Sequence, residues 1–329
     1  MNNQLYLSSS PHIHSGETTD KVMRLVIYAL LPATLLSIYF FGLPALSVLL
    51  ICTLGCMAFE ALGCILMKQP QTLKDGSAAL TGILLALNMP PSSPWWLSLL
   101  GAAIAILIGK QIYGGLGYNP FNPALVARVV LLISFPVQMT SWTAPTPLGS
   151  GIDAVTAATP LGEMKTAVML TGKLPELATS GFTDYFTGNM AGSLGEVSAL
   201  ALLLGGLFLL LKKVISWHIP VSFLGTVVIV GGIFWLVDAS KYPNPIFHLI
   251  TGGLLLGAFF MATDMVTSPV TFQGMLIFGF GCGLLTVLIR LFGGYPEGVS
   301  FAILLMNACT PLIDRYCRPK IYGQVEQKA

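Results

Sequence analysis

Apolar stretches of about 17 to 25 residues, the length of helix that crosses the hydrocarbon core of a bilayer, recur along most of this chain. We expect about ten membrane segments, at 23–42, 43–67, 78–90, 94–109, 122–136, 193–211, 214–238, 246–263, 273–292 and 299–315. Two of them, 78–90 and 122–136, are short for a full crossing, so half-helices or tilted helices are expected there. The long polar stretch is 137–192, and a connection of that length usually serves a function.

The composition fits a membrane protein and not a soluble one. Hydrophobic residues make up 54% of the chain and charged residues 9%, against about 25% charged residues in soluble domains. The net charge of +2 is too small to indicate a nucleic-acid partner. The sequence therefore predicts an all-α polytopic protein in contact with the lipid bilayer, with residues 1–329 forming a single integral membrane domain.

The two halves of the chain, about 21–136 and 193–318, carry similar motifs in the same order. Thr81-Gly82, Ser93-Pro94, Gly114-Gly115 and Ala124 recur as Thr251-Gly252, Ser268-Pro269, Gly293-Gly294 and Ala302. Because each half holds an odd number of segments, the second half would cross the membrane in the opposite sense. We therefore expect two inverted repeats of about five helices, some of them broken, an arrangement that commonly builds a site near the midplane.

The positions of the basic residues predict the orientation, because cytoplasmic loops are enriched in Lys and Arg. With the N-terminus in the cytoplasm, 11 of the 16 basic residues fall on the cytoplasmic side. They are Lys21, Arg24, Lys68, Lys74, Lys110, Lys212, Lys213, Arg315, Arg318, Lys320 and Lys328. Both termini are then cytoplasmic, and the 137–192 loop faces the periplasm.

The polar loop contains Asp153-Ala154-Val155-Thr156-Ala157-Ala158-Thr159-Pro160-Leu161. This segment resembles the flavinylation motif of the family formed by the D subunit of Rnf complexes and the B subunit of Nqr complexes. The resemblance implies that FMN is joined to the Thr159 hydroxyl through a phosphoester, by a flavin transferase acting outside the cytoplasm. Ala157 and Ala158 would keep the approach to Thr159 open, and Asp153 would orient the motif or help remove the hydroxyl proton. The alternative is an ordinary Thr-rich turn before Pro160.

Segments along nearly the whole chain resemble the same family: 10–13, 76–82, 114–124, 260–269 and 294–298. The resemblance implies a subunit of an Rnf-type ion-translocating oxidoreductase of the bacterial inner membrane, coupling ferredoxin and NAD chemistry to Na⁺ or H⁺ movement. The expected partners are the other subunits and the flavin transferase. Members of the Nqr branch also hold a second, non-covalent flavin. Asn119 and Asn122, in irregular backbone rich in Gly and Pro, are therefore candidates for a pocket that binds riboflavin.

Charged residues inside apolar segments are costly and often functional. Glu60 has two readings that the sequence leaves open: a group on an ion path, or a carboxyl hydrogen-bonded between helices. Arg128 would hold an anion or extend its side chain to the membrane surface. Asp75 and Asp264 lie at segment ends, where capping or turn formation is expected. No metal site is expected.

Other single residues favour structural roles. His248 is expected to be a hydrogen-bonded core or interfacial histidine rather than a ligand, because no His or Cys lies within metal-ligand spacing. Cys52 and Cys56 share a helix face, but no CxxC pair or His partner accompanies them, so small buried residues are expected rather than metal ligands.

Two further classes of function compete with the redox subunit. Inverted repeats with broken helices are also typical of transporters and channels without redox chemistry. A purely structural membrane anchor would leave the motif ending at Thr159 without a use.

Overall fold

The computed structural model describes residues 18–146, 156–175, 182–196 and 198–318. The described residues are helical apart from turns, loops and one isolated antiparallel bridge between Thr143 and Thr156. The elements are α1 (Thr19–Leu66), η1 (Leu73–Asp75), α2 (Ser77–Leu87), α3 (Trp95–Ala103), the π-helix η2 (Ile104–Ile108), η3 (Gln111–Tyr113), α4 (Pro123–Ser134), α5 (Pro136–Met139), α6 (Pro160–Thr171), α7 (Phe182–Thr187), α8 (Ala199–Leu211), α9 (His218–Val237), α10 (Pro245–Ile250), α11 (Leu254–Leu256), the π-helix η5 (Gly257–Met261), α12 (Phe272–Phe292) and α13 (Val299–Tyr316). The predicted all-α class is confirmed.

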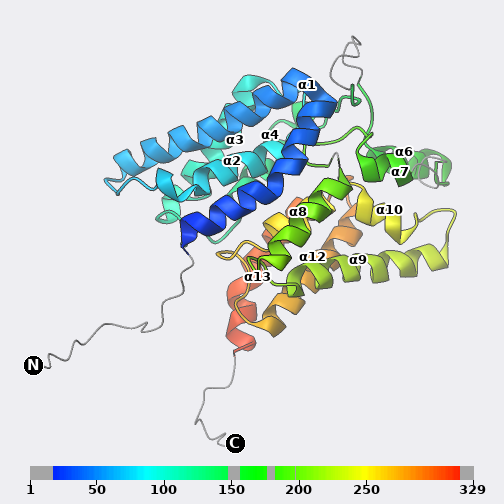
Figure 1. Cartoon of the computed structure of the whole chain (residues 1–329). Helices are drawn as coiled ribbons and strands as arrows, with labels where there is room; N and C mark the ends of the chain where they lie inside the picture. The colour runs from blue at the N-terminus through cyan, green and yellow to red at the C-terminus, as the bar shows by residue number, and fades with distance from the viewer. Residues whose placement is uncertain (1–17, 147–155, 176–181, 197, 319–329) are drawn as a thin grey trace, which may run out of the picture.

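Helix α1 bends sharply at Gly42 into two arms, which correspond to the predicted segments 23–42 and 43–67 (Figure 1). The backbone of Gly42 has φ 65° and ψ −142°, a conformation that a side chain would strain. Pro44 lies two residues further on and has no N–H to satisfy in the first turn of the second arm. This helix therefore supplies two membrane crossings.

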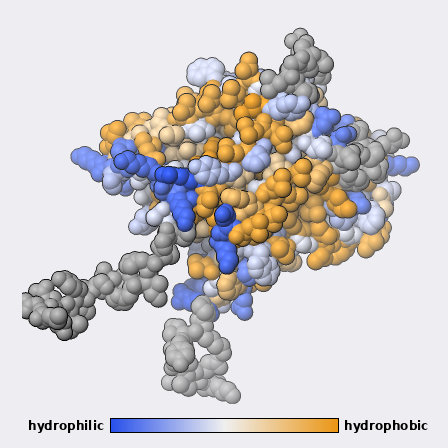
Figure 2. Space-filling view, viewed as in Figure 1, coloured by the Kyte–Doolittle hydropathy of each residue, from blue (hydrophilic) through white to orange (hydrophobic). Residues whose placement is uncertain are grey.

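Four helical stretches of the described residues are long and apolar enough to cross a membrane: Thr19–Leu66, Trp95–Tyr113, His218–Val237 and Phe272–Phe292. Shorter apolar helices cover Ser77–Leu87, Pro123–Ser134 and Ala199–Leu211. The outer surface of the helices is strongly hydrophobic, with exposed side chains such as Leu35, Leu54, Ile229 and Leu236 (Figure 2). Such a surface is suited to lipid and not to water.

Glycine allows the closest helix contacts. A Cβ atom on Gly283 of α12 would lie 2.6 Å from the Cβ of Thr226 and 2.8 Å from the carbonyl oxygen of Phe223, both on α9. Gly279, one turn earlier, faces the Ile219 carbonyl oxygen in the same way. Small residues four apart let membrane helices approach until their backbones touch.

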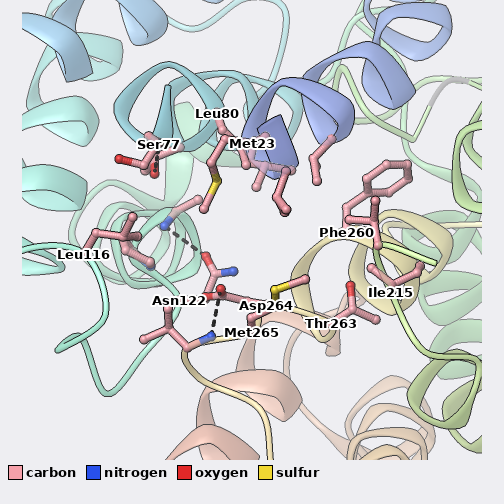
Figure 3. Close-up of a pocket in the computed structure, with 18 of the residues that line it drawn as sticks. Met23, Ser77, Leu80, Leu116, Asn122, Ile215, Phe260, Thr263, Asp264 and Met265 are labelled. Atoms are coloured by element: carbon pink, nitrogen blue, oxygen red, sulfur yellow. Dashed lines mark hydrogen bonds between the residues drawn. The ribbon is translucent and has the colours of Figure 1, made fainter. Parts of the chain in front are cut away.

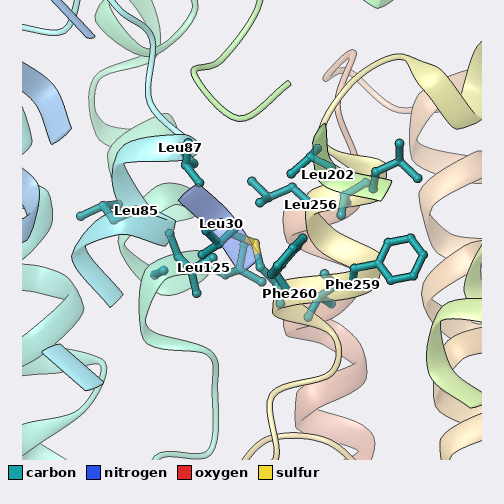
Figure 4. Close-up of a cluster of buried hydrophobic side chains, with 14 of the residues drawn as sticks. Leu30, Leu85, Leu87, Leu125, Leu202, Leu256, Phe259 and Phe260 are labelled. Carbon is teal, nitrogen blue, oxygen red and sulfur yellow. The ribbon is translucent and has the colours of Figure 1, made fainter. Parts of the chain in front are cut away.

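The two halves meet across an apolar core. In Figure 1 the blue-to-cyan helices α1–α4 form one group and the green-to-red helices α8–α13 form another, with α1 packed on α8. Figure 4 shows Leu30, Leu85 and Leu125 of the first half facing Leu202, Leu256 and Phe260 of the second. The repeat prediction itself is not tested by these contacts. They do show that both halves contribute to a single interior.

Two helices end inside the protein, as half-helices do. Helix α2 ends at Leu87, and the residue that follows, Asn88, is buried. The single segment predicted over 246–263 is wrong, because α10 ends at Ile250 and helical structure resumes only at Leu254. Gly252, with φ +71°, makes the break, and a Cβ atom there would collide with a Glu297 carboxylate oxygen.

Candidate functional site

A cavity of about 620 Å³ opens beside Thr159. It lies within the range of roughly 300–1,000 Å³ that is typical of small-molecule sites. Four parts of the chain wall it: α4, the stretch after α5, the start of α6, and the loop between α12 and α13. The lining residues used below are Arg128, Trp142, Thr156, Thr159, Tyr295 and Glu297.

Thr159 is the N-cap of α6. Its side-chain oxygen accepts a hydrogen bond from the N–H of Gly162 at 3.1 Å, and Pro160 occupies the first helical position. The residue is 8% exposed, and part of it faces the cavity. The first backbone N–H groups of a helix have no partner within the helix, so this position favours negative charge. A phosphate ester on the Thr159 oxygen would therefore lie at the positive end of α6.

The residues before Thr159 run along the cavity wall in an extended conformation. Thr156 pairs with Thr143 in the isolated bridge, and the N–H of Ala157 donates to the carbonyl oxygen of Trp142 at 3.1 Å. Ala158 also lines the cavity. Asp153 lies outside the described residues, so its predicted role in the motif stays a prediction.

Arg128 of α4 forms the inner wall of this cavity. It is only 4% exposed, so a side chain extended to the membrane surface is the wrong reading. Its Nη1 donates to the carbonyl oxygen of Asn88, just beyond the C-terminus of α2, and its guanidinium lies 5.8 Å from the centre of the Trp142 ring. A guanidinium has five N–H donors. Among the described residues only the Asn88 bond is made, which leaves donors for a ligand in the cavity.

The loop after α12 forms the opposite wall. Arg290 donates to the carbonyl oxygens of His248 at 2.7 Å and Thr251 at 3.1 Å, and it pairs with Glu297 at 3.3 Å. Arg290 therefore caps the broken end of α10 as Arg128 caps that of α2. Lys165 of α6 donates to the carbonyl oxygens of Gly293 and Tyr295, and partial burial lowers its pKa. These bonds hold α6, which carries Thr159, against the wall.

Glu60 lies elsewhere, in a buried ion pair with Lys110. Lys110 Nζ is 2.8 and 2.7 Å from the two carboxylate oxygens of Glu60, and 2.6 Å from the hydroxyl oxygen of Ser77. Thr72 also donates to Glu60, at 2.5 Å. The carboxyl is thus bonded between helices. Whether it also belongs to an ion path stays a prediction. Lys110, which the orientation argument counts among cytoplasmic basic residues, is buried and not a free loop charge.

Asn119 and Asn122 line a second cavity, shown in Figure 3 with Asn122, Asp264 and Met265 around it. Asn122 is the N-cap of α4, and its Oδ1 accepts from the N–H groups of Ala124 at 3.1 Å and Leu125 at 3.3 Å. Asn119 Oδ1 is buried and has no partner among the described residues. The cavity measures about 110 Å³, below the size of ordinary ligand sites. A second flavin at these residues stays a prediction, and as shaped the cavity is too small for it.

The remaining polar candidates have local roles. Asp75 accepts from the N–H of Ser77 at 2.8 Å, and Asp264 accepts from that of Val266 at 3.3 Å, so both form the expected turns. His248 is buried as expected, but the expectation that its ring is fully hydrogen-bonded is wrong, because its Nδ1 has no partner in the described part of the chain. Cys52 and Cys56 are buried, and no group of three metal-ligating side chains occurs among the described residues.

Comparison with known proteins assigns the family. The model of the NQR2, RnfD, RnfE family matches residues 6–323. This chain belongs to that family. A relative from Acetobacterium woodii, named as the D subunit of a Na(+)-translocating ferredoxin:NAD(+) oxidoreductase complex, is 49% identical over 98% of this chain and 97% of its own. Two further relatives are each named as the D subunit of an ion-translocating oxidoreductase complex. The one from Cronobacter sakazakii is 44% identical over 96% of this chain and 98% of its own, and the one from Stutzerimonas stutzeri is 45% identical over 93% of both chains.

The interior of this NQR2, RnfD, RnfE family member also contains charged residues that the sequence patterns did not single out. Lys110 and Arg290 stand in Gly-rich or apolar sequence with no local motif, and Glu297 lies in the segment 294–298 that resembles the family but was given no role of its own. Glu196 is a further case: it is buried, and its Oε1 accepts from the Ser193 hydroxyl at 2.8 Å. The signal that could have found them is that a charge in an apolar segment is costly and needs a partner. The partner of Lys110 is 50 residues away, whereas Glu297 is seven residues from Arg290 and Ser193 is three from Glu196.

Proposed function

We propose that this chain is the membrane-embedded D subunit of an Rnf-type complex and that it carries electrons through FMN joined to Thr159. The subunit belongs to an oxidoreductase that couples electron transfer between ferredoxin and NAD to movement of Na⁺ or H⁺ across the membrane. It works with the other subunits of that complex and is matured by a flavin transferase. FMN supplies the electron chemistry when bound, and the protein supplies position, insulation and charge.

One observation carries the proposal: Thr159 lies at the wall of a cavity of about 620 Å³, at the N-terminus of a helix and opposite a buried arginine. The residues present fit the group. The start of α6 favours a phosphate, Trp142 offers an aromatic ring beside the cavity, and Arg128 offers unused N–H donors. Leu132 adds an apolar wall.

The chain's own residues then have defined tasks. Thr159 holds the phosphoester, and the Thr143–Thr156 bridge with the Ala157–Trp142 hydrogen bond fixes the approach to it. Lys165 ties α6 to the loop that carries Glu297, so the cavity keeps its width. Asp153, Thr156, Ala157 and Ala158 are proposed as the segment that the flavin transferase recognises.

We place this protein in the bacterial inner membrane with both termini in the cytoplasm and Thr159 on the periplasmic side. The basic residues support this orientation even without Lys110, since ten of the sixteen remain on the cytoplasmic side. In Figure 1 the start of α1 and the end of α13 both lie away from α6 and α7, as the orientation requires.

The test is the mass of the peptide that contains Thr159, isolated from the complex expressed with its transferase. A peptide heavier by one FMN minus water supports the proposal, and so does protein that stays fluorescent on a denaturing gel. An unmodified peptide would contradict the proposal and would leave the competing class of function, an inverted-repeat transporter or channel without redox chemistry, as the better explanation. Transport by the purified chain alone, with no electron donor, would favour that class directly.

A further inference from the structure

Helix α2 connects the cavity at Thr159 with the buried pair of Glu60 and Lys110. Its 11 residues span about 16 Å. At its C-terminal end, the Asn88 carbonyl oxygen accepts from Arg128, which lines the cavity. At its N-terminal end, the Ser77 hydroxyl oxygen accepts from Lys110 at 2.6 Å. At each end of the helix, one hydrogen bond therefore comes from a buried cation.

The cation at the cavity end is free to respond to charge. Arg128 makes one protein hydrogen bond among the described residues, to a neutral carbonyl oxygen, and a ring contact with Trp142. A guanidinium is attracted to an anion by their opposite charges in addition to any hydrogen bond, and this attraction is stronger in a low-dielectric interior than in water. Negative charge in the cavity would compete with the Asn88 carbonyl for this side chain.

The cation at the other end is fully engaged. The three N–H bonds of Lys110 go to the two Glu60 oxygens and to Ser77. The Ser77 hydroxyl in turn donates to Asp75 at 2.6 Å. A movement of α2 along or across its axis therefore changes the distance between Ser77 and Lys110, and with it the pairing of Glu60.

We propose that Arg128 is the positioning residue through which the charge state of the group held at Thr159 acts on α2 and on the Glu60–Lys110 pair. The inference rests on the proposed function. When a reduced one-electron iron–sulfur donor such as a ferredoxin gives its electron to that group, no bond is made or broken, and the cavity gains one negative charge. Arg128 turns toward this charge and its bond to Asn88 weakens. The C-terminal end of α2 is then held only by its other bonds, from the N–H groups of Gly195 to Leu87 and of Leu194 to Met89, and it opens more often.

The experiment is hydrogen–deuterium exchange of the complete complex, oxidised and after reduction with dithionite. In the natural protein we expect the amide exchange rate across residues 84–90 to rise at least about tenfold on reduction. Loss of one hydrogen bond to a charged group shifts the equilibrium between closed and open backbone by about this factor. Arg128→Gln should show equally fast exchange in both states. Arg128→Lys, which keeps the charge, should restore part of the difference.

A redox titration gives the second measurement. Arg128→Gln removes a positive charge beside the covalent flavin and should make that flavin harder to reduce. At a fixed potential, the ratio of reduced to oxidised flavin should fall by about tenfold, in the same way that loss of a neighbouring positive charge disfavours the ionised form of an acid. Lys173→Gln, an equal loss of charge at an exposed site outside the cavity lining, should leave the ratio unchanged. A merely structural Arg128 would not give this charge-dependent shift.

The two proposals fail differently. Protein without covalent flavin would overturn the proposed function. Protein with covalent flavin whose α2 exchange is the same in both redox states would overturn the link through Arg128 and leave the flavin assignment standing. A midpoint potential that is unchanged in Arg128→Gln would overturn it as well.

Discussion

The ammonium of Lys110 lies 2.7 Å from a carboxylate oxygen of Glu60, and both side chains are buried. Removing one partner of such a pair leaves an unpaired buried charge and typically costs about 3–5 kcal/mol, whereas replacing both is often close to neutral. We therefore expect Lys110→Met to lower the melting temperature of the purified protein strongly, and Glu60→Gln with Lys110→Met to recover most of it. Lys173→Met, at an exposed site, is the control. A single variant as stable as the natural protein would show that water reaches the pair.

Glu60 also has a predicted role in ion movement. If it lies on an ion path, Glu60→Gln combined with Lys110→Met, the variant expected to keep most of its stability, should reduce the number of ions moved per electron while the flavin content stays the same, because the site then carries no charge. The measurement is ion uptake by membrane vesicles, with flavin fluorescence on a gel as the internal standard. Unchanged coupling at several pH values would leave Glu60 a structural residue.

The contact between α9 and α12 depends on Gly283. A Cβ atom added at Gly283 would lie 2.6 Å from the Cβ of Thr226, so a larger side chain must force the helices apart. Gly283→Leu should destabilise the protein by about 1–3 kcal/mol or more, seen as loss of the monodisperse peak in size-exclusion chromatography after graded heating. Gly225→Leu on α9, with no atom within 4 Å of its Cβ position, is the matched control. Equal losses in both variants would contradict this packing argument.

Local sequence patterns predicted the helices but not the contacts between them. Apolar length placed α1, α9 and α12 within a few residues of their ends, since burial in lipid demands such runs whatever the tertiary fold. The break at Gly252 was missed because Leu254–Leu256 continue the apolar pattern, and hydropathy does not register a positive φ. Thr159 was singled out through a contiguous motif, and its role stays a prediction. Arg128 and Glu297, which line the same cavity, lie 31 and 138 residues away in the sequence, and no local pattern joins them.

The orientation of the loop that carries Thr159 is open to a direct test. A reporter that is active only in the cytoplasm should be silent when fused within 165–185 and active when fused after Ala329, because the basic residues hold the opposite ends of the helices in the cytoplasm. Enzymatic activity of the reporter in cells is the measurement. The reverse pattern would put Thr159 in the cytoplasm and remove the argument for a transferase acting outside it.

Thr159 itself provides the strictest test of the covalent flavin. A phosphoester needs a side-chain oxygen, so Thr159→Ala and Thr159→Val should abolish covalent flavin, while Thr159→Ser should retain some. Fluorescence of the denatured protein on a gel is the measurement. Thr156→Ala is the matched control, because Thr156 is a hydroxyl residue of the same motif and lines the same cavity. Attachment should persist there, perturbed only through the bridge to Thr143.

Loss of the Thr159 hydroxyl also removes the hydrogen bond to the Gly162 N–H, which should cost α6 about 1 kcal/mol. This cost is too small to prevent insertion, because α6 lies outside the four long apolar stretches. Thr159→Ala should therefore reach the membrane in normal amounts and still fail to transfer electrons through the complex. A Thr159→Ala protein that remains fluorescent after denaturation would place the flavin on another residue, and Thr156 would be the first to examine.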